Sequence, residues 1–444
     1  MRNASIIKKI AKRFQKKEIF ILTEEYQKCL EVLKNTDQNL FITGKAGTGK
    51  SSFIQYFRQN TNKKVVVLAP TGIAALNCHG QTIHSFFGFP PRMINLAAIR
   101  KNPNNRVFAD LDCLVIDEIS MVRADLLDGI DKFLRLNGKD SGLPFGGIQV
   151  VFVGDLYQLP PVVTHEEFDL YSSSYDSPYF FSANSFSLDR FQVIELETIF
   201  RQNDKTFIDF LNKIRTGETS KEIFDLINQK VVSGSFDKKR HIVLCATNKV
   251  TDDLNMAKLE TIKKPLFVFK AEVDGNFPTE DRTLPVDLEL KLKIGARVLF
   301  VKNDLRRRWV NGTLGNIHKL GGNLIKVQID STGEIVEVEQ EEWDNIRYDY
   351  DEKIGGLKET VIGTLHQYPL RLAWAITIHR SQGMTLDKVC LDFSRSPFAH
   401  GQTYVALSRC RSLEGLILTR RIWPNDIVID DRIVEFHNKL LKQK

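Results

Sequence analysis

Residues 44–51 constrain the fold more than any other part of this sequence. They read Gly-Lys-Ala-Gly-Thr-Gly-Lys-Ser, which fits the pattern G-x-x-x-x-G-K-[ST], and they lie between an apolar run ending at Thr43 and a helix-like segment, residues 52–58. In such a strand–loop–helix context, the backbone N–H groups of the loop surround phosphate oxygens at the start of the helix. The sequence therefore predicts a parallel α/β sheet with a phosphate site at the carboxyl end of one strand.

The side chains in and after this loop fit chemistry on a nucleoside triphosphate. Lys50 would reach the β and γ oxygens, and Ser51 would ligate Mg²⁺. An apolar run at 114–116 ends in Asp117 and Glu118; Asp117 would hold Mg²⁺ through water, and Glu118 would polarise the attacking water. A strand that ends in two acids is often only a turn with solvated charges, but its position after a phosphate loop favours the catalytic interpretation.

A further polar residue distinguishes between kinds of phosphate enzyme. Gln158 follows the apolar run 150–153 and could reach the γ-phosphate from the end of that strand. A kinase has no need of such a sensor. Gln158 therefore favours a protein whose conformation changes with hydrolysis.

The chain of 444 residues is longer than one ordinary domain, so two or more cores are expected. Short apolar runs that alternate with helical segments predict an α/β fold of two doubly wound parallel-sheet domains. We expect the first domain over residues 20–190 and the second over residues 191–444. The strands of the first are expected at 40–43, 65–69, 114–116 and 150–153, and those of the second at 193–196, 242–245, 389–393 and 416–418.

Two stretches interrupt this alternation. Residues 88–106 contain three prolines and several basic residues without a clear strand, which predicts a small insertion in the first domain. From about residue 295 to 360 the pattern changes to short alternating strands separated by turn signals such as Asn311-Gly312 and Gly321-Gly322. We expect a small SH3-like β-barrel inserted into the second domain.

Composition restricts the possible partners only loosely. The formal net charge of +7 would suit a polyanion, but this excess is modest. The six cysteines form no C-x-x-C pair, which is typical of reduced thiols in an intracellular protein. No apolar run approaches the roughly 20 residues that cross a bilayer, and no secretory signal is recognisable. The sequence therefore predicts a soluble protein without a membrane partner.

Several further stretches together resemble the petite-integration-frequency (PIF) family of superfamily-one DNA helicases, over about residues 22–416. The resemblance is specific because the stretches are long and occur in the family's order. They are Ala69–Ala75, Gly80–Phe87, Ile116–Met121, Pro144–Gln149, Phe200–Gln202, Ala373–Thr385 and Tyr404–Cys410.

The resemblance implies two RecA-like domains with ATP and Mg²⁺ between them. Arg201 and Arg409 would reach the γ-phosphate from the second domain, completing a catalytic set with Lys50, Glu118 and Gln158. Ser51 and Asp117 would be the metal ligands. The residues implied in ATP binding are Gly44, Ala46, Gly47, Thr48, Gly49, Lys50, Ser51, Gln27, Gln382 and Gly383.

The resemblance also implies translocation 5′→3′ on single-stranded DNA by a monomeric core, with unwinding of duplex or structured DNA at single-strand/double-strand junctions. It further implies work in DNA repair, recombination and telomere maintenance, and it leaves open whether G-quadruplexes are among the structured substrates. The residues implied in DNA contact are Pro70, Thr71, Gly72, His84, Phe86, Asn248, His379 and Ser381. His84, Phe86 and His379 could equally be ordinary core residues. Arg306, Arg307 and Arg308 beside Trp309 could be a solvated charge run or could face the strand.

One departure from the family pattern concerns recognition of the base. Where the family has an adenine-sensing glutamine near the N-terminus, this chain has Tyr26, and Gln27 lies one residue late. Selectivity for ATP over other triphosphates is therefore open.

Residues 1–19 form a basic leader. Six lysines and arginines among them lie opposite Ile6, Ile7, Ile10 and Phe14, which predicts a short amphipathic helix that packs on the protein or contacts DNA. An organelle transit peptide would look similar. We expect an intracellular location, cytoplasmic in a prokaryote and nuclear or mitochondrial in a eukaryote.

Alternatives to a DNA motor differ in what they would bind. An RNA-directed helicase would share the architecture, because contacts that track phosphates do not distinguish the two polymers. A P-loop kinase or another non-translocating ATPase would show no stimulation by a polynucleotide. A non-enzymatic clamp is disfavoured by the presence of Lys50, Glu118, Arg201 and Arg409. The natural DNA structure and the recruiting partners stay open.

Overall fold

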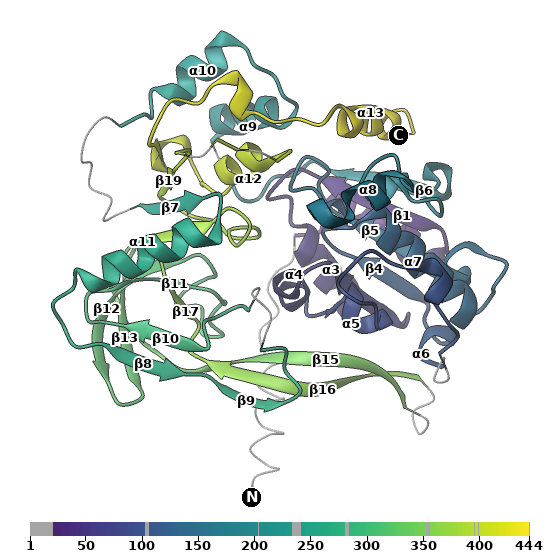
Figure 1. The fold of residues 1–444 in the computed structure, drawn as a ribbon, viewed down its shortest axis with the longest axis horizontal. Helices are drawn as coiled ribbons and strands as arrows, with labels where there is room; N and C mark the ends of the chain where they lie inside the picture. The colour runs from purple at the N-terminus through teal and green to yellow at the C-terminus, as the bar shows by residue number, and fades with distance from the viewer. Residues whose placement is uncertain are drawn as a thin grey trace, which may run out of the picture.

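A computed structural model describes residues 21–102, 106–202, 204–232, 241–279, 284–351, 356–394, 396–397 and 399–443. The predicted basic leader, residues 1–19, lies outside this range. Figure 1 shows two α/β layers joined through the upper part of the molecule and a separate antiparallel region below the second. This arrangement agrees with the predicted α/β class and its β insertion.

The first sheet is built from parallel strands, and the sequences of its central strands are mostly apolar. Its order is β3 (Gln81–Thr82), β2 (Val65–Ala69), β4 (Cys113–Ile116), β5 (Gln149–Val153), β1 (Asn39–Gly44) and β6 (Phe191–Leu196). The helices of this domain are α2 (Glu24–Asn35), α3 (Lys50–Gln59), α4 (Gly72–Asn77), α5 (Ile83–Phe87), α6 (Arg106–Ala109), α7 (Ala124–Asn137) and α8 (His165–Ser172).

Each central strand is buried on both faces because successive side chains point to opposite sides of the sheet. Leu40 and Ile42 of β1 pack with α2 and α3, whereas Phe41 between them packs with the core that includes α7. Two apolar layers therefore enclose the sheet, which explains why its strands appear in the sequence as continuous apolar runs. The loop at 44–51 leaves the carboxyl end of β1.

The strand at 191–196 corrects the predicted division of the chain. We expected residues 193–196 to begin the second domain, but β6 pairs in parallel with β1 along its whole length, from Asn39↔Phe191 to Gly44↔Leu196. It is the edge strand of the first sheet. The first domain therefore continues past residue 190, and the connection to the second starts after Leu196.

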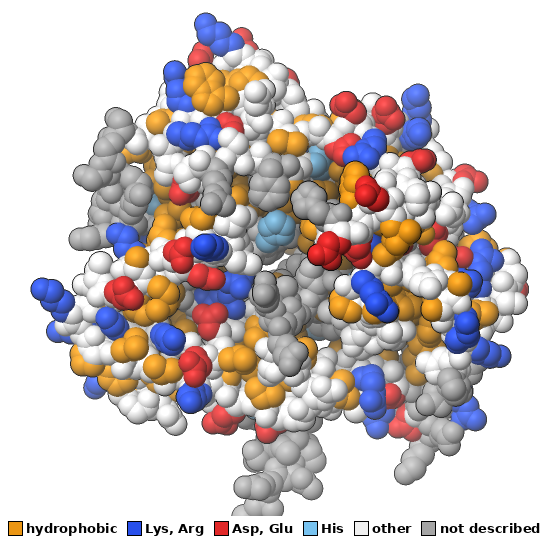
Figure 2. Space-filling model, in the orientation of Figure 1, with side chains coloured by type: hydrophobic (Ala, Val, Ile, Leu, Met, Phe, Trp, Pro, Cys, Tyr) orange, Lys and Arg blue, Asp and Glu red, His pale blue; other side chains and the backbone are white. Residues whose placement is uncertain are grey.

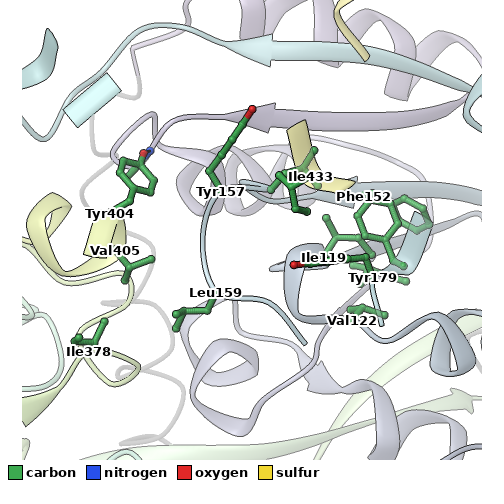
Figure 3. Close-up of a cluster of buried hydrophobic side chains, with 14 of the residues drawn as sticks. Ile119, Val122, Phe152, Tyr157, Leu159, Tyr179, Ile378, Tyr404, Val405 and Ile433 are labelled. Carbon is green, nitrogen blue, oxygen red and sulfur yellow. Dashed lines mark hydrogen bonds between the residues drawn. The ribbon is translucent and has the colours of Figure 1, made fainter. Parts of the chain in front are cut away.

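The second parallel sheet has the order β18 (Ala375–Thr377), β7 (Ile242–Cys245), β19 (Val389–Leu391) and β20 (Leu416–Leu418). Its helices are α9 (Lys205–Arg215), α10 (Lys221–Asn228), α11 (Asn248–Glu260), α12 (Gln402–Ser408) and α13 (Asp431–Leu441). One buried cluster includes side chains of both domains, and Figure 3 labels Ile378, Tyr404 and Val405 from the second with Leu159 of the first nearest to them. The two sheets thus meet at a packed interface.

The antiparallel region extends beyond the predicted limits of 295–360, since its strands run from Phe267 to Leu372. One sheet has the order β14 (Ile335–Val338), β13 (Leu324–Ile329), β12 (Leu314–Gly321), β11 (Arg297–Phe300) and β17 (Leu370–Leu372). Smaller sheets are formed by β15 (Glu341–Asp351), β16 (Gly356–Gln367) and β9 (Glu272–Gly275), and by β10 (Glu289–Leu292) with β8 (Phe267–Lys270). The predicted insertion at 88–106 contains a short 3₁₀-helix, η1 (Leu96–Ala98), within its described residues.

The long hairpin of β15 and β16 reaches from the antiparallel region to the first domain. Figure 1 shows it extending beneath α5 toward α6. The Tyr348 hydroxyl accepts a hydrogen bond from the Val67 backbone N–H at 3.5 Å, and Glu359 forms an ion pair with Arg58. The hairpin therefore bridges parts of the chain that are far apart in sequence.

The C-terminal helix α13 returns to the first domain. The Phe436 ring stacks on Phe181 with centroids 4.2 Å apart, and just before the helix Asp430 accepts a hydrogen bond from the Tyr179 hydroxyl at 2.9 Å. Both the first described helix, α2, and the last, α13, therefore pack on the first domain.

Two expectations about the whole chain can be compared with the described residues. All six cysteines are buried, and none of them forms a disulfide. Of the helices in the described ranges, none combines the length and apolarity needed to cross a bilayer.

We predict that Phe152→Ala destabilises the first domain by about 3–5 kcal/mol, the range for removing a buried aromatic side chain. Phe152 is completely buried and its ring packs against Phe180 and Phe191 at 5.6 and 4.7 Å. Urea denaturation would measure the loss. Phe168→Ala is the control, since Phe168 is 60% exposed, and an equal loss in both variants would contradict the packing described.

Candidate active site

Glycines give the phosphate loop its tight path. Gly47 and Gly49 have positive φ angles of 85° and 75°. A Cβ on Gly47 would lie 2.6 Å from the Cβ of Arg201, and one on Gly49 would lie 2.4 Å from the Tyr26 hydroxyl. Neighbouring segments thus approach the loop so closely that a side chain would not fit at either position. The two neighbouring residues, Arg201 and Tyr26, lie outside the loop.

Lys50, the first residue of α3, folds back over the loop. Its Nζ donates hydrogen bonds to the Gly44 carbonyl at 2.7 Å and to the Lys45 carbonyl at 3.0 Å. Burial lowers the pKa of Lys50, and the carboxylates of Asp155 and Glu118 oppose that effect. The ammonium group is therefore held where phosphate oxygens would meet it.

The two acids at the end of β4 lie beside this lysine. Ser51 Oγ donates to Asp117 Oδ2 at 3.4 Å, which places a hydroxyl and a carboxylate oxygen side by side, the hard oxygen ligands that Mg²⁺ takes. Burial raises the pKa of both Asp117 and Glu118, and the Glu118 charge raises that of Asp117 further. Among the described residues no three His, Cys, Asp or Glu side chains group as a metal site, so any ion here would depend on this pair and on ligands from the nucleotide.

Arg409 follows α12 directly and is 1% exposed. It donates hydrogen bonds to the carbonyls of Val405 and Ser381 at 3.0 and 3.3 Å and to Ser408 Oγ at 2.8 Å. Burial and the neighbouring Arg201 lower its pKa to about 9. The guanidinium therefore remains charged at neutral pH, fixed by backbone groups of the second domain.

Arg201 lies in the connection between β6 and α9 rather than on the second sheet. Its guanidinium donates to the carbonyls of Ser408 and Gly383, both at 3.4 Å. The positive charges of Arg409 and Arg201 both lower the pKa of Glu118. Two guanidinium groups held by the second domain thus act electrostatically on an acid of the first.

Gln158 and Gln382 meet across the two domains. Gln382 Nε2 donates to Gln158 Oε1 at 3.4 Å, and Gln158 Nε2 donates to Asp155 Oδ2 at 3.4 Å. Gly383 beside Gln382 has a φ of 77°. A residue expected to sense the γ-phosphate is therefore linked directly to Gln382, which the resemblance implies in ATP binding.

Of the two candidates for base recognition, Tyr26 is the one turned toward the phosphate loop. It is buried, and its hydroxyl donates to the Thr48 carbonyl at 2.7 Å. Its ring stacks between Phe53 and the partly exposed Phe200, with centroids 5.1 and 6.4 Å away. Gln27 is exposed on the outer side of α2.

The predicted DNA contacts of the first domain line an interdomain cavity in part. Pro70, Thr71 and Gly72 are half-buried at the carboxyl end of β2, and the Thr71 hydroxyl accepts a hydrogen bond from the Ala74 N–H at the start of α4. The cavity lies between this domain and the antiparallel region, and its wall includes Gly72, Gln81, Ser85, Asn276 and Asn345.

His84 and Phe86 lie on α5 and are both half-buried. Burial lowers the pKa of His84. The Phe86 ring packs edge-on against Phe108 at 5.3 Å and against Tyr348 of the hairpin at 5.8 Å. In this arrangement the hairpin covers an aromatic side chain predicted to meet DNA.

The predicted DNA contacts of the second domain divide into two groups. Asn248 and His379 are exposed, each just beyond a strand of the second sheet. Ser381 is completely buried, its hydroxyl donates to the Ile378 carbonyl at 2.7 Å, and its own carbonyl accepts from Arg409. In this structure the Ser381 carbonyl helps to hold Arg409, and the buried Ser381 side chain does not face the surface where DNA would bind.

The basic cluster beside Trp309 also differs from the expected surface group. Trp309 is buried and stacks on Phe300 with centroids 4.3 Å apart, so it offers no platform for a base. Arg308 pairs with Asp304 at 2.7 Å and covers the Trp309 ring. Arg306 and Arg307 are exposed. On the face drawn in Figure 2, lysines and arginines are interspersed with acids, so charge on that face does not by itself mark a path for a polyanion.

Three residues without a predicted role lie at the centre of the site: Asp155, Arg215 and Tyr404. Tyr404 falls within a stretch that carries the family resemblance, which was the available signal, and Asp155 lies three residues before Gln158. Arg215 ends an amphipathic helix, where a basic residue is ordinary, and nothing in the sequence pairs it with Asp155.

Comparison with known proteins agrees with this geometry. A model of the PIF1-like helicase family matches residues 21–224, and a second helicase model matches residues 327–433. The ATP-dependent DNA helicase Pif1 of Bdellovibrio bacteriovorus is 33% identical over 429 residues, which cover 94% of this chain and 92% of that protein. The chain belongs to the PIF1-like helicase family. The mouse ATP-dependent DNA helicase PIF1 is 35% identical, and this chain spans 63% of its length.

Solved PIF1-like structures resemble the fold to different degrees. Bacteroides Pif1 in complex with ADP-AlF4 matches with a TM-score of 0.86 and 38% identity, covering 96% of this chain and 98% of that one. The same protein bound to single-stranded DNA matches with a TM-score of 0.67 and 38% identity, covering 95% and 97%. Membership of this family makes the chain an ATP-hydrolysing enzyme.

We predict weak discrimination between ATP and GTP. A site that hydrogen-bonds a substrate group rejects analogues without it by about 10⁴–10⁵, but the Tyr26 hydroxyl is engaged by Thr48 and Gln27 is exposed. kcat/KM for GTP should therefore lie within about tenfold of that for ATP.

The comparison requires kcat/KM for both nucleotides in the wild type and in Tyr26→Gln, which restores the amide of the family pattern. We expect the variant to favour ATP more strongly than the wild type does. A wild-type preference for ATP of several hundredfold would contradict this account of base recognition.

Proposed function

We propose that this chain is an ATP-driven motor that moves 5′→3′ along single-stranded DNA and unwinds the duplex at a junction. The observation that carries the proposal is the meeting of Arg409 and Arg201 with Glu118 and Lys50 across the domain interface. A kinase or a static ATPase has no need to divide its charged groups between two packed domains.

Hydrolysis would use groups from both sides of the interface. Lys50 and the loop N–H groups would bind the β and γ phosphates, and Glu118 would orient and polarise the attacking water. Arg409 and Arg201 would stabilise the charge that develops on the γ-phosphate. Because these arginines are fixed to backbone carbonyls of the second domain, their contribution depends on how closely the two domains approach.

Ser51 and Asp117 are the residues that would hold Mg²⁺, whose charge would offset that of the phosphates. Their oxygens lie 3.4 Å apart, and burial together with the Glu118 charge raises the pKa of Asp117, so a cation beside this carboxylate would stabilise its charged form. The protein's part is to present these oxygens beside Lys50.

Movement along DNA would follow from the link between the nucleotide and the DNA side. Gln382 contacts Gln158 next to the phosphate site, while His379, three residues earlier, is exposed. Closing the interface around ATP would shift this segment together with whatever strand it contacts. Separating a base pair costs about 1.4 kcal/mol of stacking per step, so each step requires coupling to nucleotide chemistry.

The proposal predicts that single-stranded DNA stimulates ATP hydrolysis and that unwinding requires a 5′ single-stranded tail. Phosphate release would be measured with DNA and RNA of equal length and sequence, and strand separation with 5′- and 3′-tailed duplexes. Greater stimulation by RNA would make the chain an RNA-directed helicase. Hydrolysis that no polynucleotide stimulates would favour a non-translocating ATPase.

We predict that Arg409→Ala lowers the hydrolysis rate by about 10³–10⁵, the range for losing an arginine finger. Nucleotide binding by the first domain should persist, and stimulation by DNA should vanish because closure no longer brings the charge to the phosphate. Arg409→Lys should rescue poorly, since an ammonium lacks the planar fork of donors.

Paired measurements of nucleotide affinity and turnover, each with and without a single-stranded oligonucleotide, would check this. Arg190→Ala serves as the control because it removes an exposed arginine for which neither a phosphate contact nor a DNA contact is predicted. Turnover of Arg409→Ala that DNA still stimulates to near the wild-type rate would assign Arg409 a structural role.

A further inference from the structure

Arg215, the last residue of α9, is buried in an ion pair that joins the two domains. Its Nε and Nη2 both donate to Asp155 Oδ1, at 3.2 and 3.0 Å. The side chains are 4% and 0% exposed. Its guanidinium also lies over the Tyr157 ring, 4.4 Å from the centroid. Burying two charges is costly unless their remaining hydrogen-bonding capacity is used, so the other partners of Asp155 determine what this pair does.

Asp155 also forms a hydrogen bond with Tyr404 of α12. Its Oδ2 accepts a hydrogen bond from the Tyr404 hydroxyl at 3.3 Å, and that hydroxyl accepts one from the Ala46 backbone N–H at 3.0 Å. A carboxylate only accepts hydrogen bonds, so it fixes the direction of the phenolic proton and leaves the oxygen lone pairs toward Ala46. Arg215, Asp155, Tyr404 and Ala46 are thereby connected from α9 to the phosphate loop, and Asp155 accepts hydrogen bonds from both sides.

The same carboxylate also acts on Lys50. Asp155 is the largest favourable charge near the Lys50 ammonium, while Arg215 is the largest near Asp155. With Arg215 in place, the charge of Asp155 is shared between two cations. Without it, Lys50 would be the main cation facing a buried carboxylate and would be drawn away from the phosphate chain.

Tyr404 also determines where α12 lies relative to the phosphate loop. Arg409 follows this helix directly, and its Nε donates to the Val405 carbonyl one residue after Tyr404. A change in how Tyr404 seats on Ala46 would therefore move Arg409 with it. Figure 3 shows Tyr404 and Val405 at successive positions of this segment, with Ile378 close to Val405.

We propose that Arg215 is a positioning residue for ATP hydrolysis, which acts through Asp155 to seat Tyr404 on the phosphate loop and so aligns Lys50 and Arg409. The proposal rests on the mechanism above and adds a requirement to it. Arg215 touches neither the nucleotide site nor DNA directly in this scheme; it holds the groups that do.

The test is a double-mutant cycle of Arg215→Gln and Tyr404→Phe, with kcat and KM for ATP measured without DNA. Each single variant should lower kcat about tenfold or more while changing KM only a few-fold. The double variant should be about as slow as the slower single variant, because residues in one network are non-additive. Arg215→Lys should recover part of the rate, since it keeps the charge but not the fork.

Arg297→Gln is the matched control for stability. Arg297 is 2% exposed and forms an ion pair with Asp330 at 3.0 Å within the antiparallel region. It should lower the thermal midpoint as Arg215→Gln does but leave kcat unchanged.

Two results would overturn the proposal. One is a kcat of Arg215→Gln within twofold of wild type despite a lowered thermal midpoint; the other is a double variant whose loss of rate equals the product of the two single losses. Because these rates are measured without DNA, they are independent of whether DNA stimulates the wild type. A wild type that hydrolyses ATP without such stimulation would therefore defeat the motor proposal and leave this test intact.

Discussion

Opposite charges buried between the two parallel sheets are the constraint on which the rest of the structure depends. Asp117, Asp155, Arg215 and Arg409 are each at most 5% exposed, and the loss of hydration for one buried ion amounts to several kcal/mol. The acids come from the first sheet, whereas the arginines come from segments packed on the second. The charges of each domain therefore offset the loss of hydration of the opposite charges buried in the other domain. Association of the domains and assembly of the catalytic set are one physical requirement, and this explains why the polar contacts at the interface are concentrated beside the phosphate loop.

The sequence was informative where local chemistry alone determines structure. Strands buried on both faces are continuous apolar runs, and a phosphate loop needs glycines at set positions, so β1, β4 and the residues at their ends were predictable. Sheet membership was not, because β6 has the same apolar pattern as any buried strand and only its pairing with β1 shows where it belongs. Side-chain direction was equally hidden for Ser381, whose neighbours in the sequence are exposed or half-buried. Arg215 could not be predicted at all, since its partner Asp155 is far away in sequence and a basic residue in the last turn of a helix is ordinary.

The contacts predicted for DNA should be considered together with the arrangement of the domains. Bacteroides Pif1 has the same 38% identity to this chain in its unliganded and DNA-bound structures, yet the TM-scores are 0.86 and 0.67. Sequence divergence is therefore equal in the two comparisons, and the difference lies in how the parts are placed. This chain has the arrangement nearer to the unliganded relative. In this arrangement Tyr348 packs against Phe86, and His379 is exposed.

The return of α13 to the first domain has a consequence for how the protein folds during synthesis. The aromatic face that receives Phe436 belongs to Phe180, Phe181 and Phe186, which leave the ribosome long before the helix that covers them. Domains usually fold as units in the order of synthesis, but here an apolar face of the earlier unit stays open until α13 emerges. The nascent first domain must remain soluble with that face exposed, and a chain truncated before residue 431 would keep it exposed permanently. Completion of the first domain thus depends on the emergence of α13 rather than on the length of that domain.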